Sequence, residues 1–441
     1  MTQSELRWYK LDNAAKIYPI LTSDRFTYVF RVAATLKESV NQDVLYQAIL
    51  KSKKRFPSYF VRVKRGLFWY YFEENQRDPI LEHESPFVCK RLDNHLNNGY
   101  MFAFYYYDKR ISLEMNHSLS DGSGAIRFLT AVVFEYLKMM GKELIADDSI
   151  ITLDSRVRIE ELEDSYAANF SADALNPPKI PRAYFKKEKG FRIRGSGVIN
   201  SFIDTSEFLS LAKSVSASIT QYVVALLIYS SIATGDKGKL RKRPVNICVP
   251  VNLRGAYHSE TLSNFSLYFH SIYYMKQEDP DFMDILAKVK EDFLVENSPE
   301  KIQSKLNTVC AIQKKIFIKL IPLPIKYVLF KIGYSIFGRI PTTMTFSNFR
   351  KVVIPPSMEE HIDHFSFYMG SGMKTAIAMN SFKGKTSIVF SRAVKNTDLE
   401  KTFFRFLADK GLKIELTSNY WEYFRKKGHE KNCQSLFSLS S

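Results

Sequence analysis

Hydrophobic residues along this chain recur with two different periods, one typical of strands and one typical of helices. Ile111, Leu113 and Met115 alternate with polar residues, which is the two-residue period of a half-buried strand. Runs rich in apolar and aromatic residues predict further strands and hairpins. These are strands at residues 26–36 and 245–251 and hairpins at 60–72 and 101–116. The first two-thirds of the chain therefore contain several strands.

Helical periodicity follows the strand that ends near residue 116. Ile126, Leu129, Val133 and Leu137 recur at helical spacing, and the run stops at Gly141. The other predicted helices are residues 42–54, 206–214, 220–233 (capped at 219–220), 282–295 and 398–410. Short strands at 344–346, 365–369, 374–380 and 385–390 are assigned to a second sheet. Helices and strands mixed throughout indicate an α/β protein.

The pattern weakens between residues 144 and 194. Acidic residues, three prolines and a lysine-rich run are typical of a segment that crosses the surface. We therefore expect two halves, residues 1–175 and 196–441, joined by a linker at 176–195. A chain of 441 residues is long enough for both halves to have a core.

One histidine lies where a strand ends and a helix begins. His117 directly follows the strand, and Asp121-Gly122 opens the helix. A hydrogen-bonded histidine beside a helix cap is one interpretation. A metal pair is a second, but the nearby glycines indicate a turn and no third ligand is near, so we expect no metal. The third is a general base, because neutral imidazole accepts a proton near neutral pH.

The hexapeptide from His117 to Gly122 resembles the HxxxDG signature of the coenzyme A-dependent acyltransferase superfamily, which includes chloramphenicol acetyltransferase and the condensation domains of peptide synthetases. Two further stretches resemble its motifs in the same order: residues 250–254 (PVNLR) and 345–349 (TFSNF). The opening at 8–12 and the end near 411–412 are similar to bacterial alcohol acetyltransferases. A departure is Phe349-Arg350, where many members have Leu-Gly.

The resemblance implies an α/β fold of two chloramphenicol acetyltransferase-like mixed-sheet domains with the active site in a channel between them. Residues 1–175 would be the acyltransferase half that carries HxxxDG, and residues 196–441 the other half. It implies transfer of an acyl group such as acetyl from acyl-CoA to an alcohol or amine. No cofactor would be permanently bound, and acyl-CoA or an acyl-carrier-protein thioester would be the co-substrate.

The resemblance also implies roles for individual residues. His117 would be the general base, and Asp121 would pair with Arg254 and shape the site. Backbone N–H groups at Gly122, or the Ser347-Asn348 strand, would stabilise the oxyanion. Two alternatives stay open. One is ester or amide condensation from a carrier-bound thioester, and the other is a non-catalytic lipid- or carrier-binding protein on the same fold.

The formal net charge is +17, from 63 basic and 46 acidic residues. A solvated basic surface needs no partner, but coenzyme A phosphates, an acidic carrier protein or an anionic membrane would also suit it. The basic residues are dispersed and no nucleic-acid motif is present, so we expect no nucleic-acid partner. Four scattered cysteines and no export signal favour the cytoplasm.

Residues 316–337 are the most apolar stretch of the chain. Lys319, Lys326 and Lys331 and two prolines interrupt it, which excludes a membrane span. It is either a basic amphipathic element on the surface, with peripheral membrane contact, or a set of core helices with snorkelling lysines.

Overall fold

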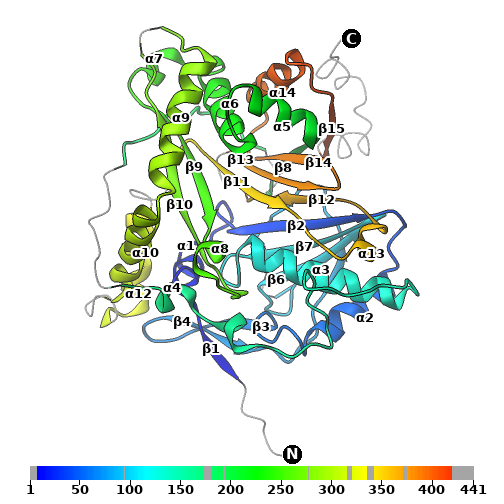
Figure 1. The fold of residues 1–441 in the computed structure, drawn as a ribbon. Coiled ribbons are helices and arrows are strands. Elements are labelled where there is room, and N and C mark those ends of the chain that lie inside the picture. Colours follow the sequence, from blue (N-terminus) through cyan, green and yellow to red (C-terminus); the bar gives the residue numbers. More distant parts are fainter. Residues whose placement is uncertain are drawn as a thin grey trace, which may run out of the picture.

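Two large β-sheets, stacked on each other and covered by helices on their outer sides, form the framework of the structure (Figure 1). The computed structural model describes residues 7–93, 95–171, 180–191, 194–276, 278–314, 320–334, 342–370 and 375–419, with side chains of 312–314 excluded. The sheets are both mixed, and each has its own hydrophobic cluster, so the fold is α/β with two mixed-sheet domains.

The five-stranded sheet contains the strand that leads to His117. Its strands, in spatial order, are β12 (Ile362–Tyr368), β2 (Val29–Leu36), β7 (Arg110–Asn116), β6 (Phe102–Tyr107) and β5 (Leu81–His83). Helices α2 (Gln42–Ser52) and α3 (Gly122–Met139) cover it. The apolar stripe predicted for α3 is buried against the sheet, since Leu129 and Val133 are inaccessible to solvent.

The seven-stranded sheet belongs to the second half. Its strands, in order, are β10 (Ser266–Tyr273), β9 (Val245–Asn252), β11 (Met344–Lys351), β13 (Ala376–Phe382), β14 (Lys385–Arg392), β8 (Gly197–Asp204) and β15 (Ile414–Ser418). Its helices are α5 (Thr205–Ser214), α6 (Ile219–Ala233), α9 (Phe282–Glu296) and α14 (Asp398–Asp409). Strand β11 is parallel to both of its neighbours, and the other pairs are antiparallel.

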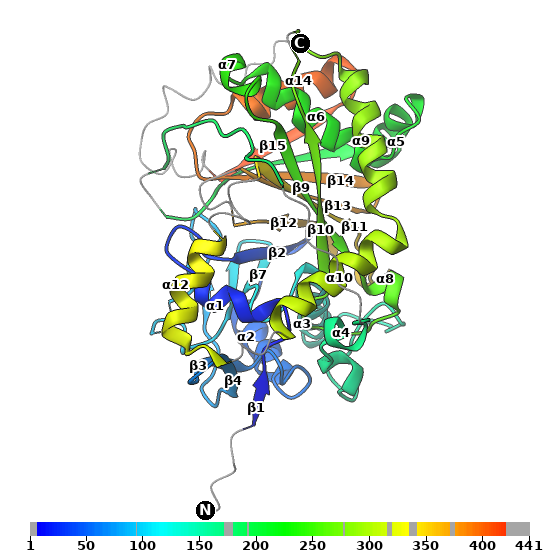
Figure 2. The ribbon, with the colours of Figure 1, turned by 90° about the vertical axis from the view of Figure 1, so that its left-hand side faces the viewer.

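Smaller elements complete the fold. A three-stranded sheet is formed by β1 (Trp8–Lys10), β4 (Tyr70–Glu74) and β3 (Val61–Arg65). The short helices are η1 (Ala15–Ile17), α1 (Tyr18–Leu21), η2 (Ile159–Leu162), α4 (Ser165–Ala168), α7 (Lys237–Leu240), α8 (Arg254–Tyr257) and α13 (Pro356–Glu359). Two longer helices, α10 (Pro299–Lys314) and α12 (Leu323–Gly333), run along one side of the molecule (Figure 2).

Most of the predicted elements are confirmed within a few residues, including both hairpins and the helix after His117. One assignment is wrong, because β12 lies in the five-stranded sheet and not in the second one. It pairs with β2, and Phe365 and Phe367 are buried in the N-terminal core. An alternating pattern identifies a strand but does not specify its partner, and β12 packs against both sheets.

The predicted start of α6 is also wrong. Ser218 caps the helix, accepting from the Gln221 N–H, while the Gln221 side chain accepts from the Ser218 N–H. The helix is buried on nearly all sides, as expected from its apolar sequence. Strands β8 and β10 were not predicted, because polar residues interrupt their alternation.

The apolar stretch at 316–337 contains α12, and residues 315–319 and 335–341 lie outside the described residues. Among the helices that the structure describes, none is by itself long and apolar enough to cross a membrane. The domain division at 176–195 stays a prediction.

Candidate active site

The backbone of His117 is held from both halves of the chain. Its N–H donates to the Tyr28 carbonyl at the start of β2 (2.8 Å), and its carbonyl accepts from Asn264 Nδ2 (2.9 Å). The preceding Asn116 side chain donates to Thr27 and accepts from the Ser118 N–H, which closes the turn. The imidazole is therefore presented by a fixed turn at the end of β7.

Aromatic rings enclose the imidazole. The Phe30 ring centroid lies 4.5 Å from that of His117, and Tyr18 in α1 stacks on it at 5.3 Å with an interplanar angle of 28°. His117 Nδ1 is buried and has no hydrogen-bond partner among the residues that the structure describes. Burial lowers the pKa of His117 below its usual value, and the Asp121 charge offsets only part of this effect. The ring is consequently neutral at pH 7 and able to accept a proton.

Asp121 is fully engaged in hydrogen bonds. Its Oδ1 accepts from the N–H groups of Ser123 (3.0 Å) and Gly124 (3.2 Å), so it caps α3. Its Oδ2 accepts from Arg254 Nη1 and from the Phe265 N–H, both at 2.9 Å. Burial acts to raise the pKa of Asp121, but Arg254 and the N–H donors outweigh it and hold that pKa below its usual value.

The predicted ion pair between Asp121 and Arg254 is present, with both side chains about nine-tenths buried. Arg254 also donates to the Thr261 and Ser263 carbonyls (2.9 and 2.6 Å). Strand β9 leads the chain from the second half to this arginine beside α3 (Figure 1). The pair therefore joins the two halves next to the His117 turn.

Gly122 is required by close packing. A Cβ at this position would lie 2.0 Å from a ring carbon of Phe349, at the end of β11. Phe349 in turn stacks on Phe367 of β12, with the ring centroids 4.0 Å apart. The Phe349 that departs from the family pattern thus fills the space above the glycine.

The side chain of Asn348, one of the predicted oxyanion donors, already has hydrogen-bond partners within the protein. Asn348 Nδ2 donates to the Thr220 hydroxyl at the start of α6, and its Oδ1 accepts from the Arg350 N–H. Ser347 is nearly buried in β11 beside β13. At the start of α3 the N–H groups of Ser123 and Gly124 are occupied by Asp121. A role for Gly122, Ser347 or Asn348 as an oxyanion donor stays a prediction.

Asp12 and Asn264 support the His117 turn. Asp12 ends the stretch at 8–12 that resembles alcohol acetyltransferases, but the sequence predicted no role for either residue. Asp12 Oδ1 accepts from the Ala15 N–H, and Oδ2 accepts from Asn264 N and Nδ2. Burial raises the pKa of Asp12 to about 7. The same Asn264 amide binds the His117 carbonyl, so Asp12 orients it. The contact between Asp12 and Asn264 spans 252 residues, so a local sequence pattern could not predict it.

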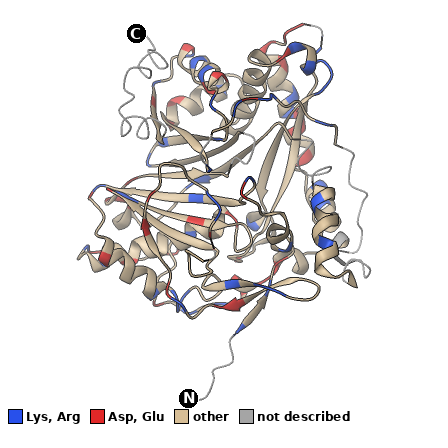
Figure 3. Ribbon diagram, turned by 180° about the vertical axis from the view of Figure 1, so that it is seen from behind, with Lys and Arg blue, Asp and Glu red and all other residues tan. Residues whose placement is uncertain are grey.

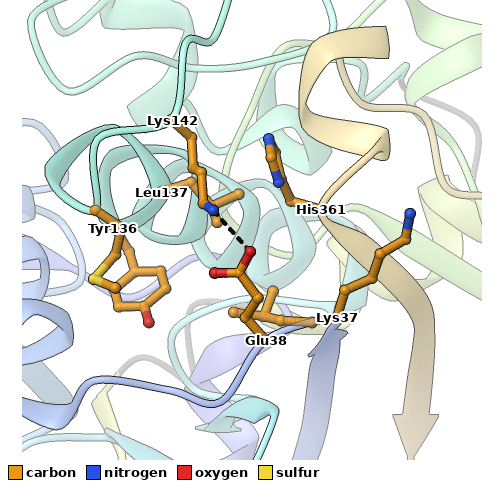
Figure 4. A pocket seen from close by; sticks show the side chains of 8 residues that line it. Lys37, Glu38, Tyr136, Leu137, Lys142 and His361 are labelled. Carbon is orange, nitrogen blue, oxygen red and sulfur yellow. Dashed lines mark hydrogen bonds and ion pairs between the residues drawn. The ribbon is translucent and has the colours of Figure 1, made fainter.

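The pocket in Figure 4 is separate from the His117 site. It is lined by Leu36, Lys37, Glu38, Tyr136, Leu137, Met140, Lys142 and His361, and a 2.7 Å ion pair between Lys142 and Glu38 crosses it. It lies at the far end of α3, about 25 Å along the helix from Asp121 at 1.5 Å per residue. The predicted substrate channel is therefore not this pocket, and the channel stays a prediction.

Neither a family model nor a curated protein sequence matches the chain. Solved structures do match. The trichothecene 15-O-acetyltransferase TRI3 from Fusarium sporotrichioides is 9% identical with a TM-score of 0.54, over 91% of this chain and 94% of that one. TRI101 from F. graminearum, complexed with coenzyme A and T-2 mycotoxin, is 10% identical with a TM-score of 0.58, over 90% and 96%.

A third match is the starter condensation domain of rhizomide synthetase RzmA, solved as a single-residue variant in complex with C8-CoA. It is 10% identical with a TM-score of 0.57, over 90% of this chain and 94% of that one. The chain thus has the two-domain, chloramphenicol acetyltransferase-like fold that acetyltransferases and condensation domains share. This fold was expected from the three motifs, and the expectation is confirmed.

Proposed function

We propose that this protein is an acyltransferase that moves an acyl group from an acyl-CoA thioester to an alcohol or amine, with His117 as the general base. The observation that carries the proposal is the His117 turn, with a neutral, aromatic-enclosed imidazole directly before the Asp121–Arg254 pair. The fold adds support, because similar structures were solved with coenzyme A or C8-CoA.

The reaction needs one base and no covalent intermediate. A nitrogen of the His117 ring takes the proton of the acceptor hydroxyl or amine as its oxygen or nitrogen attacks the thioester carbonyl carbon. The tetrahedral oxyanion then collapses and the carbon–sulfur bond breaks. The departing coenzyme A thiolate takes the proton from the imidazolium, so the enzyme returns to its starting state.

Asp121 has a structural role in this proposal. Its two oxygens already accept four hydrogen bonds, and Arg254 neutralises its charge. A carboxylate with a lowered pKa in such surroundings is a poor proton acceptor. The pair instead fixes the start of α3, and with it the turn that carries His117.

Turnover tests the proposal directly. Release of coenzyme A thiol is measured for acyl-CoA donors of two to sixteen carbons with alcohol and amine acceptors, and the acylated product is identified by mass. His117→Ala should lower the rate by roughly 10²–10⁴-fold while leaving the fold intact, because a positioned base contributes about that much. His361→Ala, at the pocket of Figure 4, is the matched control and should leave the rate unchanged.

Near wild-type turnover by a folded His117→Ala protein would exclude His117 as the base. No turnover by the wild type with any free acyl-CoA, followed by turnover with carrier-bound thioesters, would favour the condensation alternative. The similarity to a starter condensation domain and the net charge of +17 support testing that donor. No turnover with either donor, but saturable thioester binding, would favour the non-catalytic alternative. The cytoplasmic location stays a prediction.

A further inference from the structure

Helix α12 carries its apolar stripe on the outside of the molecule. Ile325, Val328, Leu329 and Ile332 follow the i, i+3, i+4, i+7 spacing of one helical face, and they are 54, 55, 52 and 56% exposed. A surface helix normally turns such a stripe toward the core. Contiguous exposed apolar side chains of this kind mark an interaction surface.

The inner face of α12 fixes this orientation. The Leu323 N–H donates to the Leu67 carbonyl, and Lys326 Nζ donates to the Phe68 carbonyl, both at 2.9 Å. The same ammonium group lies 3.7 Å from the centroid of the Trp69 ring. Burial lowers the pKa of Lys326 to about 8. This lysine is therefore an anchor to the turn between β3 and β4 and does not face outward.

The turn between β3 and β4 extends the exposed apolar surface. Leu67 and Phe68, which hold α12 through their carbonyls, have side chains that are 71 and 37% exposed. We call the four stripe residues of α12 and these two side chains the α12 patch. It lies at one side of the molecule, next to α1 (Figure 2).

Basic side chains lie beside the patch, since Arg65 of β3 and Lys331 of α12 are both close enough to Tyr70 to interact with it electrostatically. Residues 301–358 contain ten lysines and arginines and no aspartate or glutamate, so α12 lies within a long acid-free segment. Figure 3 shows the acidic and basic positions on the ribbon. Exposed apolar side chains within a basic segment complement a lipid surface with anionic headgroups, which attracts each nearby basic residue by about 1 kcal/mol.

The patch is also close to the proposed site. Helix α12 packs on α1, and Tyr18 of α1 stacks on the His117 ring. Tyr334, just after α12, meets the Tyr28 ring at 6.1 Å, and the Tyr28 carbonyl accepts from the His117 N–H. One short helix therefore separates the α12 patch from the imidazole.

We propose that the α12 patch docks on an anionic lipid surface, with its stripe in the interface and the surrounding basic residues among the headgroups. Docking goes beyond acyl transfer and does not depend on it. It would place the His117 site next to a membrane that contains hydrophobic acceptors or receives hydrophobic products.

Vesicle binding tests the proposal with the full-length protein and no substrate. Co-sedimentation is measured with phosphatidylcholine vesicles that contain 30% phosphatidylglycerol or none, in 50 and 500 mM salt. The wild type should bind the anionic vesicles, and high salt should weaken binding. Replacing Val328, Leu329 and Ile332 with Asn should lower the partition coefficient at least about tenfold, since each buried methylene contributes about 0.8 kcal/mol.

A matched control replaces three exposed apolar residues outside the patch. Ile145, Ile159 and Leu294 are 78, 81 and 79% exposed, and their Asn variants should bind as the wild type does. Wild-type protein that stays in the supernatant at low salt would overturn the proposal, as would equal binding by the patch variant or equal loss by the control. Sedimentation velocity tests whether a second copy of the chain covers the patch instead. A wild-type dimer that the patch variant abolishes, together with no vesicle binding, would show that it does. Thermal melting confirms that each variant is folded.

Discussion

Asp121 and Arg254 form a buried ion pair in which each charge stabilises the other. Both side chains are about nine-tenths buried, and each has further hydrogen bonds with the backbone. Desolvating a charge is costly, so the pair is stable only while both members are present.

Replacing one partner of the Asp121–Arg254 pair should therefore destabilise the protein. Asp121→Ala or Arg254→Ala should each lower the free energy of unfolding by about 3–5 kcal/mol and reduce turnover. Asp279→Ala is the control, because its 2.7 Å pair with Lys237 is exposed and should contribute less than about 1 kcal/mol. Urea denaturation measures both, and an Asp121→Ala protein as stable as the wild type would contradict the assigned role.

Glu400 should make stability depend on pH. Its side chain is buried, Oε2 has no hydrogen-bond partner within the described part of the chain, and burial raises its pKa to about 7, although Arg392 opposes this. Between pH 4.5 and 7 the native state therefore keeps a proton that the unfolded state loses, so stability falls as pH rises through this window.

Glu400→Gln should remove that dependence. The variant should match the wild type near pH 4.5 and be more stable at pH 8, by on the order of 3 kcal/mol. Urea denaturation across the pH range gives the difference between the two proteins. Glu415→Gln, on the exposed face of β15, should not change the profile. A pH-independent difference for Glu400→Gln would disprove the raised pKa.

The start of α3 packs against the end of β11. The Phe349 ring lies against Gly122, and its stacking on Phe367 leaves little freedom to move away. A methyl group on Gly122 would consequently force α3 and β11 apart, although alanine favours helix formation.

Gly122→Ala should destabilise the protein by about 1–3 kcal/mol, the usual cost of overpacking, and lower turnover by shifting the His117 turn. Gly255→Ala is the control in a second helix, since a Cβ there would meet nothing within 4 Å. Thermal melting and coenzyme A release measure the two effects. Restored stability in Gly122→Ala with Phe349→Leu would confirm that the ring is the obstacle.

The segment at residues 261–265 connects the second half of the chain to the His117 turn through hydrogen bonds. Asn264 donates to the His117 carbonyl, and the Tyr59 hydroxyl donates to the Leu262 carbonyl (2.8 Å). Arg254 and Asp121 hold the same segment through its backbone. The position of the base is therefore set by contacts from both halves.

Removing the side-chain amide of Asn264 should make the position of His117 less fixed. Asn264→Ala should cost about 1–3 kcal/mol, because the His117 carbonyl loses this donor and Asp12 Oδ2 keeps only the backbone N–H of residue 264. It should lower kcat more than it raises KM, since the base is misplaced while substrate contacts persist. Tyr59→Phe should be milder, because Ser120 still donates to the Leu262 carbonyl. An unchanged kcat in Asn264→Ala would show that this segment does not position His117.

Short-range sequence patterns were enough to predict the local structure around the site. Alternation up to Asn116 and helical spacing after Gly122 placed His117 at a strand-to-helix turn, because both periods depend only on neighbouring residues. The order of three motifs indicated the fold and the pairing of Asp121 with Arg254, through resemblance.

The contacts between distant parts of the chain became known from the folded structure. It placed β12 in the first sheet, bound Asp12 to Asn264, set Phe349 on Gly122 and turned the stripe of α12 outward. Periodicity records that a face is apolar but not what covers it, and it carries no information on which distant residues will meet. Those contacts depend on how whole elements pack, so they exist only in the folded chain.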